Sequence, residues 1–137
     1  MKGHSKPSVL LIEDDRALAA AIARELRAGG LRVETADCVE DGVARVRLFR
    51  HDLVVCDLRL GDRTALEVLD AIEPLDYRPP VLLMSAWPPT DVAELVRRHA
   101  IVVGYLHKPF EMAALRGLVD RTLHRGLDGS PDVQRTV

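Results

Sequence analysis

Hydrophobic residues follow two alternating patterns along the chain. Short apolar runs with little or no polar alternation are typical of β-strands that are covered on both faces. Four such runs, and a fifth in which apolar and polar residues alternate (31–36), lie at Val9–Ile12, Leu31–Ala36, Leu53–Cys56, Val81–Met84 and Ile101–Val103. The segments between and after them repeat apolar residues every three or four positions, as amphipathic helices do. The pattern therefore predicts five strands and five helices in alternation.

Strict alternation of strands and helices favours a parallel sheet with helices on both faces. Asp15 is expected to cap the first helix, and three later helices are expected to begin after Asp37, Thr64 and Asp91, because each is followed three residues later by Glu. Gly126 is expected to end the last helix. We therefore expect one domain over 8–125 and a flexible tail or linker stub over 126–137.

Composition narrows the class of protein further. The 137 residues suit one domain, and 47% hydrophobic with 29% charged residues is ordinary for a soluble globular chain. A net charge of −2 favours neither direct nucleic-acid binding nor an anionic membrane partner. Cys38 and Cys56 form no C-x-x-C pair, and the five histidines show no metal-ligand spacing and are interpreted as surface or helix-face residues. These features predict a reduced, cytoplasmic protein.

Chemically useful side chains follow the predicted strands. Glu13 and Asp14 end the first strand, Asp57 ends the third, Ser85 the fourth, and Lys108 follows the fifth. Ligands of parallel α/β sheets bind at the carboxyl ends of the strands, so we expect these groups to converge. Clustered carboxylates suit Mg²⁺, and a carboxylate beside Mg²⁺ and an ammonium is a competent nucleophile toward a phosphoryl group.

Four segments that contain these residues resemble the receiver domain of two-component response regulators. They are Val9–Asp15, Val54–Leu58, Leu83–Ala86 and Tyr105–Phe110, and the resemblance covers 8 to 125. It implies a flavodoxin-like, doubly wound parallel five-stranded sheet of order 2-1-3-4-5 with five helices. It also implies a regulatory domain, not an enzyme, that receives a phosphoryl group from a sensor histidine kinase or a phosphotransfer protein. The fourth helix, fifth strand and fifth helix would then form the face that an effector of unknown identity recognises.

The resemblance also implies a role for single residues. Asp57 would be the phosphoacceptor, and Glu13, Asp14 and Asp57 would bind Mg²⁺ together with the backbone carbonyl of Arg59. The loop after Asp57 departs from the family in its shape-determining positions, because Gly61 stands where the family usually has Pro, and Ala65 where it usually has Gly.

Further roles concern the response to phosphorylation. Ser85 would be the switch hydroxyl, Lys108 would contact the phosphoryl group, and Tyr105 would be the aromatic switch residue. Pro109 lies where the family usually has a cis peptide bond after its lysine. Apolar Val92 and Val96 beside Tyr105 favour contact with a second copy, as a homodimer, or with an effector once the loop rearranges.

Two positions are expected to control the access of water to Asp57. In the family, they lie two residues after the acceptor and two after the switch hydroxyl, which are Arg59 and Trp87 here. Neither side chain can orient a water as a carboxylate or amide would, so we expect slow self-dephosphorylation. Alternatively, Trp87 packs outward against the fourth helix and leaves the approach open.

Other classes of protein compete with this interpretation. An interaction module with the same fold could act without phosphorylation, although the set of acids, serine and lysine argues against it. An aspartate-using phosphohydrolase would need an acid at the position of Arg59. A flavin-binding redox domain would be yellow when purified.

Overall fold

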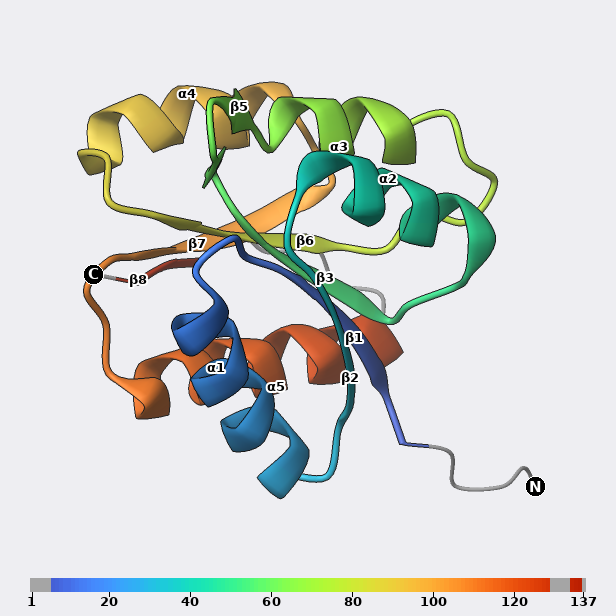
Figure 1. Cartoon of the computed structure of the whole chain (residues 1–137), viewed down its shortest axis with the longest axis vertical. Helices are drawn as coiled ribbons and strands as arrows, with labels where there is room; N and C mark the ends of the chain where they lie inside the picture. The colour runs from blue at the N-terminus through green and yellow to red at the C-terminus, as the bar shows by residue number, and fades with distance from the viewer. Residues whose placement is uncertain (1–5, 129–133, 137) are drawn as a thin grey trace.

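A six-stranded parallel sheet forms the centre of the protein in a computed structural model that describes residues 6–128 and 134–136 (Figure 1). Its order is β2-β1-β3-β6-β7-β8. The strands are β1 (Ser8–Ile12), β2 (Arg32–Ala36), β3 (Leu53–Asp57), β6 (Val81–Ser85), β7 (Val102–His107) and β8 (Gln134–Thr136). A separate antiparallel hairpin consists of β4 (Arg59–Leu60) and β5 (Arg63–Thr64). When the hairpin and β8 are left out and the five other strands are renumbered along the chain, their order is 2-1-3-4-5. The predicted strand order is therefore confirmed.

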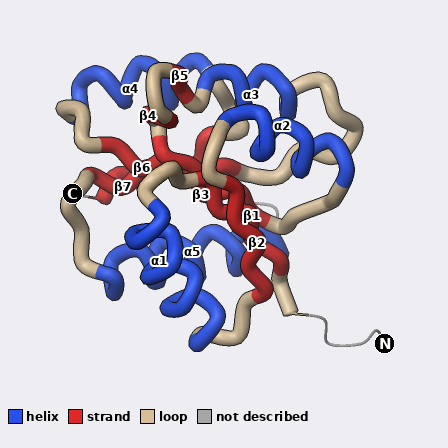
Figure 2. The backbone as a smooth tube through the Cα atoms, in the orientation of Figure 1, coloured by secondary structure: helices blue, strands red, loops and turns tan. Residues whose placement is uncertain are grey.

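Helices cover both faces of the sheet, as Figure 2 shows. They are α1 (Arg16–Ala28), α2 (Val39–Leu48), α3 (Leu66–Ile72), α4 (Pro89–Arg98) and α5 (Met112–Asp128). α1 and α5 lie on one face, and α2, α3 and α4 lie on the other (Figure 1). The described part of the chain contains no helix with the length and apolar character needed to cross a bilayer.

Each face of the sheet has its own hydrophobic core, because successive strand residues point to opposite faces. In β1, Val9 and Leu11 pack toward α1 and α5, while Leu10 and Ile12 pack toward α2, α3 and α4. All four are fully buried. Burial on both faces explains why the predicted strands appear as unbroken apolar runs.

The helix starts differ from several predictions. Asp15 caps α1 as expected and accepts a hydrogen bond from the Leu18 N–H at 3.1 Å. The capping residue of α2 is Cys38 and not Asp37, and its sulfur accepts from the Asp41 N–H. α3 begins after Ala65, without a side-chain cap. α4 begins at Pro89, ahead of the expected start, because proline suits the first position of a helix.

The C-terminal region is more regular than the expected tail. α5 continues through Gly126 to Asp128, so the predicted helix end at this glycine is wrong. Gln134–Thr136 then forms β8, which pairs in parallel with Gly104–Leu106 of β7. The outer edge of β7 offers backbone groups that an added strand can satisfy. The rest of the predicted tail, 129–133 and residue 137, lies outside the described residues.

Truncation of a core leucine should destabilise this fold far more than truncation of a surface leucine. Leu10 is fully buried in β1, whereas Leu48 at the end of α2 is 73% exposed. We expect Leu10→Ala to lower the free energy of unfolding by about 2–5 kcal/mol, because it leaves a cavity in the core. Leu48→Ala should change it by less than about 0.5 kcal/mol. Urea denaturation measures both, and equal losses would contradict this packing.

Candidate functional site

Four strand ends bring polar side chains to one edge of the sheet. Glu13 follows β1, Asp57 ends β3, Ser85 ends β6 and Lys108 follows β7. The parallel pairing of β1, β3, β6 and β7 places these ends on the same side. Glu13, Asp57 and Ser85 are only 1%, 7% and 2% exposed. Buried polar groups of this kind need partners within the protein or from a ligand.

Lys108 supplies the positive charge of the cluster. Its Nζ donates to Glu13 Oε1 and to Asp57 Oδ2, both at 3.0 Å. The other oxygen of the Glu13 carboxylate accepts from the Asp15 N–H at 3.1 Å. Glu13 and Asp57 are therefore joined by a single ammonium, and the predicted convergence of these three residues is observed.

One ammonium does not neutralise the acids around it. The pKa of Glu13 is raised from 4.5 to about 7, mainly by burial and in smaller part by the nearby charge of Asp57, although hydrogen bonds from Lys108 and Asp15 oppose the rise. Burial opposes the charge of Lys108, but hydrogen bonds to Asp57 and Glu13 outweigh it and raise the pKa of the lysine. The site therefore favours an additional cation.

The donor set fits a divalent metal ion. One carboxylate oxygen from each of Glu13, Asp14 and Asp57 lies within 4.8 Å of the others. These are hard oxygen ligands of the kind that Mg²⁺ prefers, and the exposed Asp14 opens the group to solvent. A role for the Arg59 backbone carbonyl as a further ligand stays a prediction.

Ser85 connects the acid cluster to the neighbouring loops. Its hydroxyl oxygen accepts from the Trp87 N–H at 2.9 Å, and its carbonyl accepts from the Lys108 N–H at 2.7 Å. The peptide bond between Lys108 and Pro109 is cis, as predicted. A movement of Ser85 would therefore alter hydrogen bonds to both the loop before α4 and the loop after β7.

The side chains of Arg59 and Trp87 lie one over the other, and the backbone of Arg59 contacts Asp57. The guanidinium carbon of Arg59 lies 5.7 Å from the centroid of the Trp87 ring, within the range of a cation–π interaction. The half-buried Trp87 also packs against the core on the α4 side of the sheet. The Arg59 N–H donates to Asp57 Oδ1 at 3.4 Å. The two expected flanking side chains thus form a stacked pair.

The apolar residues expected on the output face are buried. Val92, Val96 and Tyr105 are 1%, 5% and 3% exposed, and all three belong to the core between the sheet and α4. The face therefore does not present them in this structure. The predicted homodimer or effector contact through these residues would require a rearrangement of α4.

A second contact to the acid cluster comes from a hairpin that the hydrophobic pattern did not predict. The Gly61 N–H, at the turn between β4 and β5, donates to Asp14 Oδ2 at 2.9 Å. Arg63 of β5 pairs with Glu40 of α2 and Glu67 of α3. The glycine in place of the family's usual proline was the one signal in the sequence, since proline has no N–H to donate.

Two further polar features lie outside the acid cluster. His51 is 2% exposed, so its interpretation as a surface residue is wrong. Its Nε2 lies 3.0 Å from Glu34, and this hydrogen bond is the largest cause of the lowered pKa of Glu34. Cys56 is fully buried, as expected of a core residue, and burial raises the pKa of its thiol.

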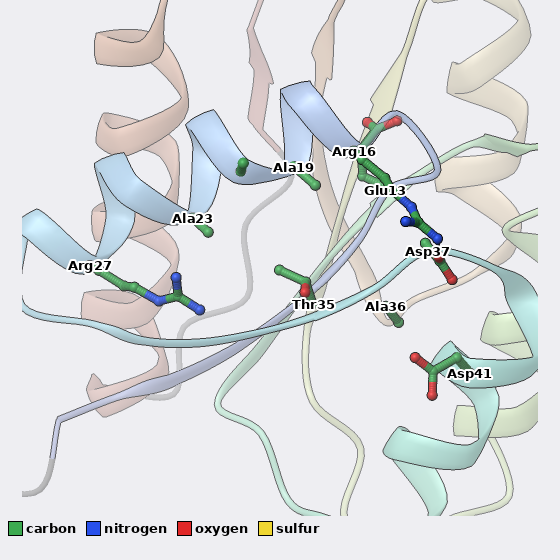
Figure 3. Close-up of a pocket in the computed structure, with 10 residues that line it drawn as sticks. Glu13, Arg16, Ala19, Ala23, Arg27, Thr35, Ala36, Asp37 and Asp41 are labelled. Carbon is green, nitrogen blue, oxygen red and sulfur yellow. Dashed lines mark hydrogen bonds and ion pairs between the residues drawn. The ribbon is translucent and has the colours of Figure 1, made fainter.

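An open pocket lies between α1 and β2, next to Glu13 (Figure 3). Arg16 pairs with Asp37 at 3.1 Å at one end of this pocket, and Arg27 donates to the carbonyl of Val33 at the other. Both arginines are thus already engaged by the protein. The pocket extends from Glu13 along α1, where small side chains such as Ala19 and Ala23 line it.

Comparisons with known proteins agree with this geometry. The chain matches the family model of the response regulator receiver domain over residues 9–120. It is 36% identical to the transcriptional regulatory protein AfsQ1 of Streptomyces coelicolor over 126 residues, which cover 92% of this chain and 55% of the relative. The cell cycle transcriptional regulator CtrA of Caulobacter vibrioides is 29% identical, over 93% of this chain and 55% of that protein. The chain spans about half the length of these curated relatives.

Solved structures agree in fold. The non-phosphorylated HemR receiver domain from Leptospira biflexa matches with a TM-score of 0.76 and 26% identity, over 86% of this chain and 94% of that chain. A CheY-like receiver domain protein from Methanospirillum hungatei matches with a TM-score of 0.84 and 19% identity, over 92% and 100%, and shows the fold alone. The chain belongs to the response regulator receiver domain family, and its fold is the flavodoxin-like, CheY-like one.

Neutralising Glu13 should change how the stability of the metal-free protein depends on pH. The pKa of the Glu13 carboxyl is 4.5 in the unfolded chain and about 7 in the folded one. Between these pH values, the folded state therefore binds more protons than the unfolded state. The contribution of Glu13 to stability is therefore full below the lower value and is lost as pH rises through the upper one. We expect the free energy of unfolding of Glu13→Gln, relative to the original protein, to increase over this range.

Urea denaturation in chelator at a series of pH values measures this difference. Glu111→Gln, which replaces an exposed glutamate, is the matched control and should show no such trend. A difference between Glu13→Gln and the original protein that stays constant with pH would contradict the raised pKa.

Proposed function

We propose that Asp57 is the phosphoacceptor of a two-component signalling system and that Mg²⁺ is required for the transfer. The observation that supports this most directly is the position of Lys108, whose ammonium joins Asp57 to Glu13 at the edge of the sheet. The donor would be a sensor histidine kinase or a phosphotransfer protein. In the transfer, an Asp57 oxygen forms a bond to phosphorus while the bond from phosphorus to the histidine nitrogen breaks, and that nitrogen keeps the electron pair.

The surrounding residues would divide the work of the transfer. Glu13, Asp14 and Asp57, with the Arg59 carbonyl, would hold Mg²⁺, which when bound neutralises charge on the phosphoryl oxygens. The ammonium of Lys108, which lies between Glu13 and Asp57, would contact a phosphoryl oxygen. The chain would assist only its own phosphorylation and dephosphorylation, as a regulatory domain and not as an enzyme acting on other substrates.

The response would pass through Ser85 and Tyr105. A phosphoryl group on Asp57 offers new acceptor oxygens to the Ser85 hydroxyl, which now accepts from the Trp87 N–H. Movement of this loop would disturb the packing of Tyr105 against α4. The face of α4, β7 and α5 would then be recognised by an effector or a second copy in the cytoplasm. The two relatives reported above are transcriptional regulators, so control of transcription is one output that this face would serve.

The stacked pair of Arg59 and Trp87 would slow the loss of the phosphoryl group. Hydrolysis needs a water in line with the bond between Asp57 and phosphorus. A large ring over Arg59 would hinder that approach, and neither side chain of the pair would activate a water. The proposed function is thus a persistent signal.

A small phosphodonor should test the phosphoacceptor directly. We expect acetyl phosphate to add one base-labile, acid-stable phosphoryl group to the original protein only when Mg²⁺ is present. Asp57→Asn should abolish the labelling, because the amide is not a competent nucleophile. Asp52→Asn, at an exposed position before β3, is the control that should label normally.

Intact-protein mass spectrometry measures the added phosphoryl group. Labelling that persists in Asp57→Asn, or in the presence of chelator, would exclude this site. Complete absence of labelling in the original protein would favour an interaction module that acts without phosphorylation.

The lifetime of the phosphorylated state should depend on the stacked pair. We expect the double variant Arg59→Asn, Trp87→Glu to lose its phosphoryl group several-fold faster, because it opens the approach and supplies groups that orient water. Trp87→Phe keeps an aromatic ring and is the matched control. Decay of purified phosphoprotein measures the rate, and an equal or slower decay in the double variant would exclude the guarding role.

A further inference from the structure

The hairpin of β4 and β5 holds a turn directly over the acid cluster. Leu60 pairs with Arg63, so Gly61 and Asp62 form a two-residue turn between the two short strands. Gly61 has a φ of 69°, which glycine adopts without the steric penalty of a side chain. The first position of a two-residue hairpin turn commonly requires such a backbone. The conformation directs the Gly61 N–H at Asp14.

The Gly61 N–H is hydrogen-bonded to Asp14, one of the three carboxylates of the candidate metal site. The Gly61 N–H donates to Asp14 Oδ2 at 2.9 Å. Among the described residues, it is the single hydrogen-bond donor to the Asp14 side chain. Asp14 is exposed, whereas Glu13 and Asp57 are buried and are already held by Lys108. Of the three carboxylates, that of Asp14 is therefore held by the fewest contacts, and the turn provides its hydrogen bond.

Contacts to α2, α3 and the core hold the hairpin that carries the Gly61 N–H. Arg63 forms ion pairs with Glu40 of α2 and with Glu67 of α3. Leu60 is 4% exposed and belongs to the core on that face of the sheet. The Ala65 N–H donates to the carbonyl of Leu58 at 2.9 Å, which closes the base of the hairpin. The turn is thus attached to α2, α3 and the core, and it does not depend on Asp14 alone.

We propose that the Gly61 N–H is a positioning group of the metal site, which holds Asp14 so that a carboxylate oxygen stays within reach of Glu13 and Asp57. The inference rests on the proposed binding of Mg²⁺ to these acids. Hydrogen bonds to ligating carboxylates orient them and commonly change metal affinity by about 10–100-fold. Because coupling between two events is reciprocal, Mg²⁺ bound to Asp14 in turn stabilises the hairpin turn.

The test compares two substitutions at the same position. Gly61→Pro removes the N–H and also fixes φ near about −65°, away from the observed 69°, so it removes both the donor and the turn conformation that directs it. Gly61→Asn keeps the N–H and has a side chain that tolerates a positive φ. We expect Gly61→Pro to weaken Mg²⁺ binding by about tenfold and Gly61→Asn to change it by less than about threefold. Calorimetric titration of the purified protein with Mg²⁺ measures both affinities without any phosphoryl transfer.

Stability in chelator separates a positioning role from a merely structural one. A merely structural turn would lower the melting temperature of Gly61→Pro without altering its Mg²⁺ affinity, and this result would overturn the inference. If the original protein binds Mg²⁺ and Gly61→Pro binds it equally well, the inference alone is wrong. If the original protein does not bind Mg²⁺, the proposed metal site is wrong as well.

Amide hydrogen exchange provides a second measurement that does not require the proline variant to fold. In the original protein, the Gly61 amide should exchange more slowly than the same amide in Asp14→Ala, and Mg²⁺ should slow it further. Arg45→Ala is a control that should leave the rate unchanged, because the ion pairs of Arg45 are with Glu34 and Asp41 and not with the hairpin. Equal Gly61 rates in the original protein and Asp14→Ala would overturn the hydrogen bond on which the inference depends.

Discussion

The ammonium of Lys108 lies between two buried carboxylates, and the candidate site depends on this arrangement. Two 3.0 Å contacts join it to Glu13 and Asp57, which come from different strands. Burying charged groups is costly unless they are paired, and here one positive charge serves two acids while Asp14 lies nearby. Burial is the main cause of the raised pKa of Glu13, and the nearby charge of Asp57 adds to it. An additional cation would offset the excess negative charge, and a new negative group on Asp57 would change which partners Lys108 holds.

The sheet holds these charged groups close together because it is buried between two hydrophobic cores. Strand residues such as Leu10 and Leu11 pack into separate cores on opposite faces, so the strand ends have little freedom to separate. The loops at those ends are then tied to one another, through Ser85 to Trp87 and Lys108, and through Gly61 to Asp14. A local change at Asp57 would thus be transmitted through short, direct contacts to the loop before α4.

Sequence reasoning predicted the five core strands, their order and the convergence of Glu13, Asp57 and Lys108, since these follow from apolar runs and from the geometry of parallel sheets. It misplaced the helix starts where several residues could satisfy the same backbone N–H groups, as Cys38 does in place of Asp37. It missed the hairpin because β4 and β5 have two residues each, and its ion pairs from Arg63 join segments that are distant in sequence. The burial of His51 likewise depends on the distant Glu34.

The most direct test of the account is the thermal stability of the protein with and without Mg²⁺. A ligand that binds only the folded state raises the melting temperature as its concentration increases. The account predicts a rise with Mg²⁺ that NaCl of equal ionic strength does not reproduce, and that is largely lost in the double variant Asp14→Ala, Asp57→Ala. A melting temperature that responds equally to both salts, or a Mg²⁺ effect that persists in the double variant, would contradict a cation site at these carboxylates.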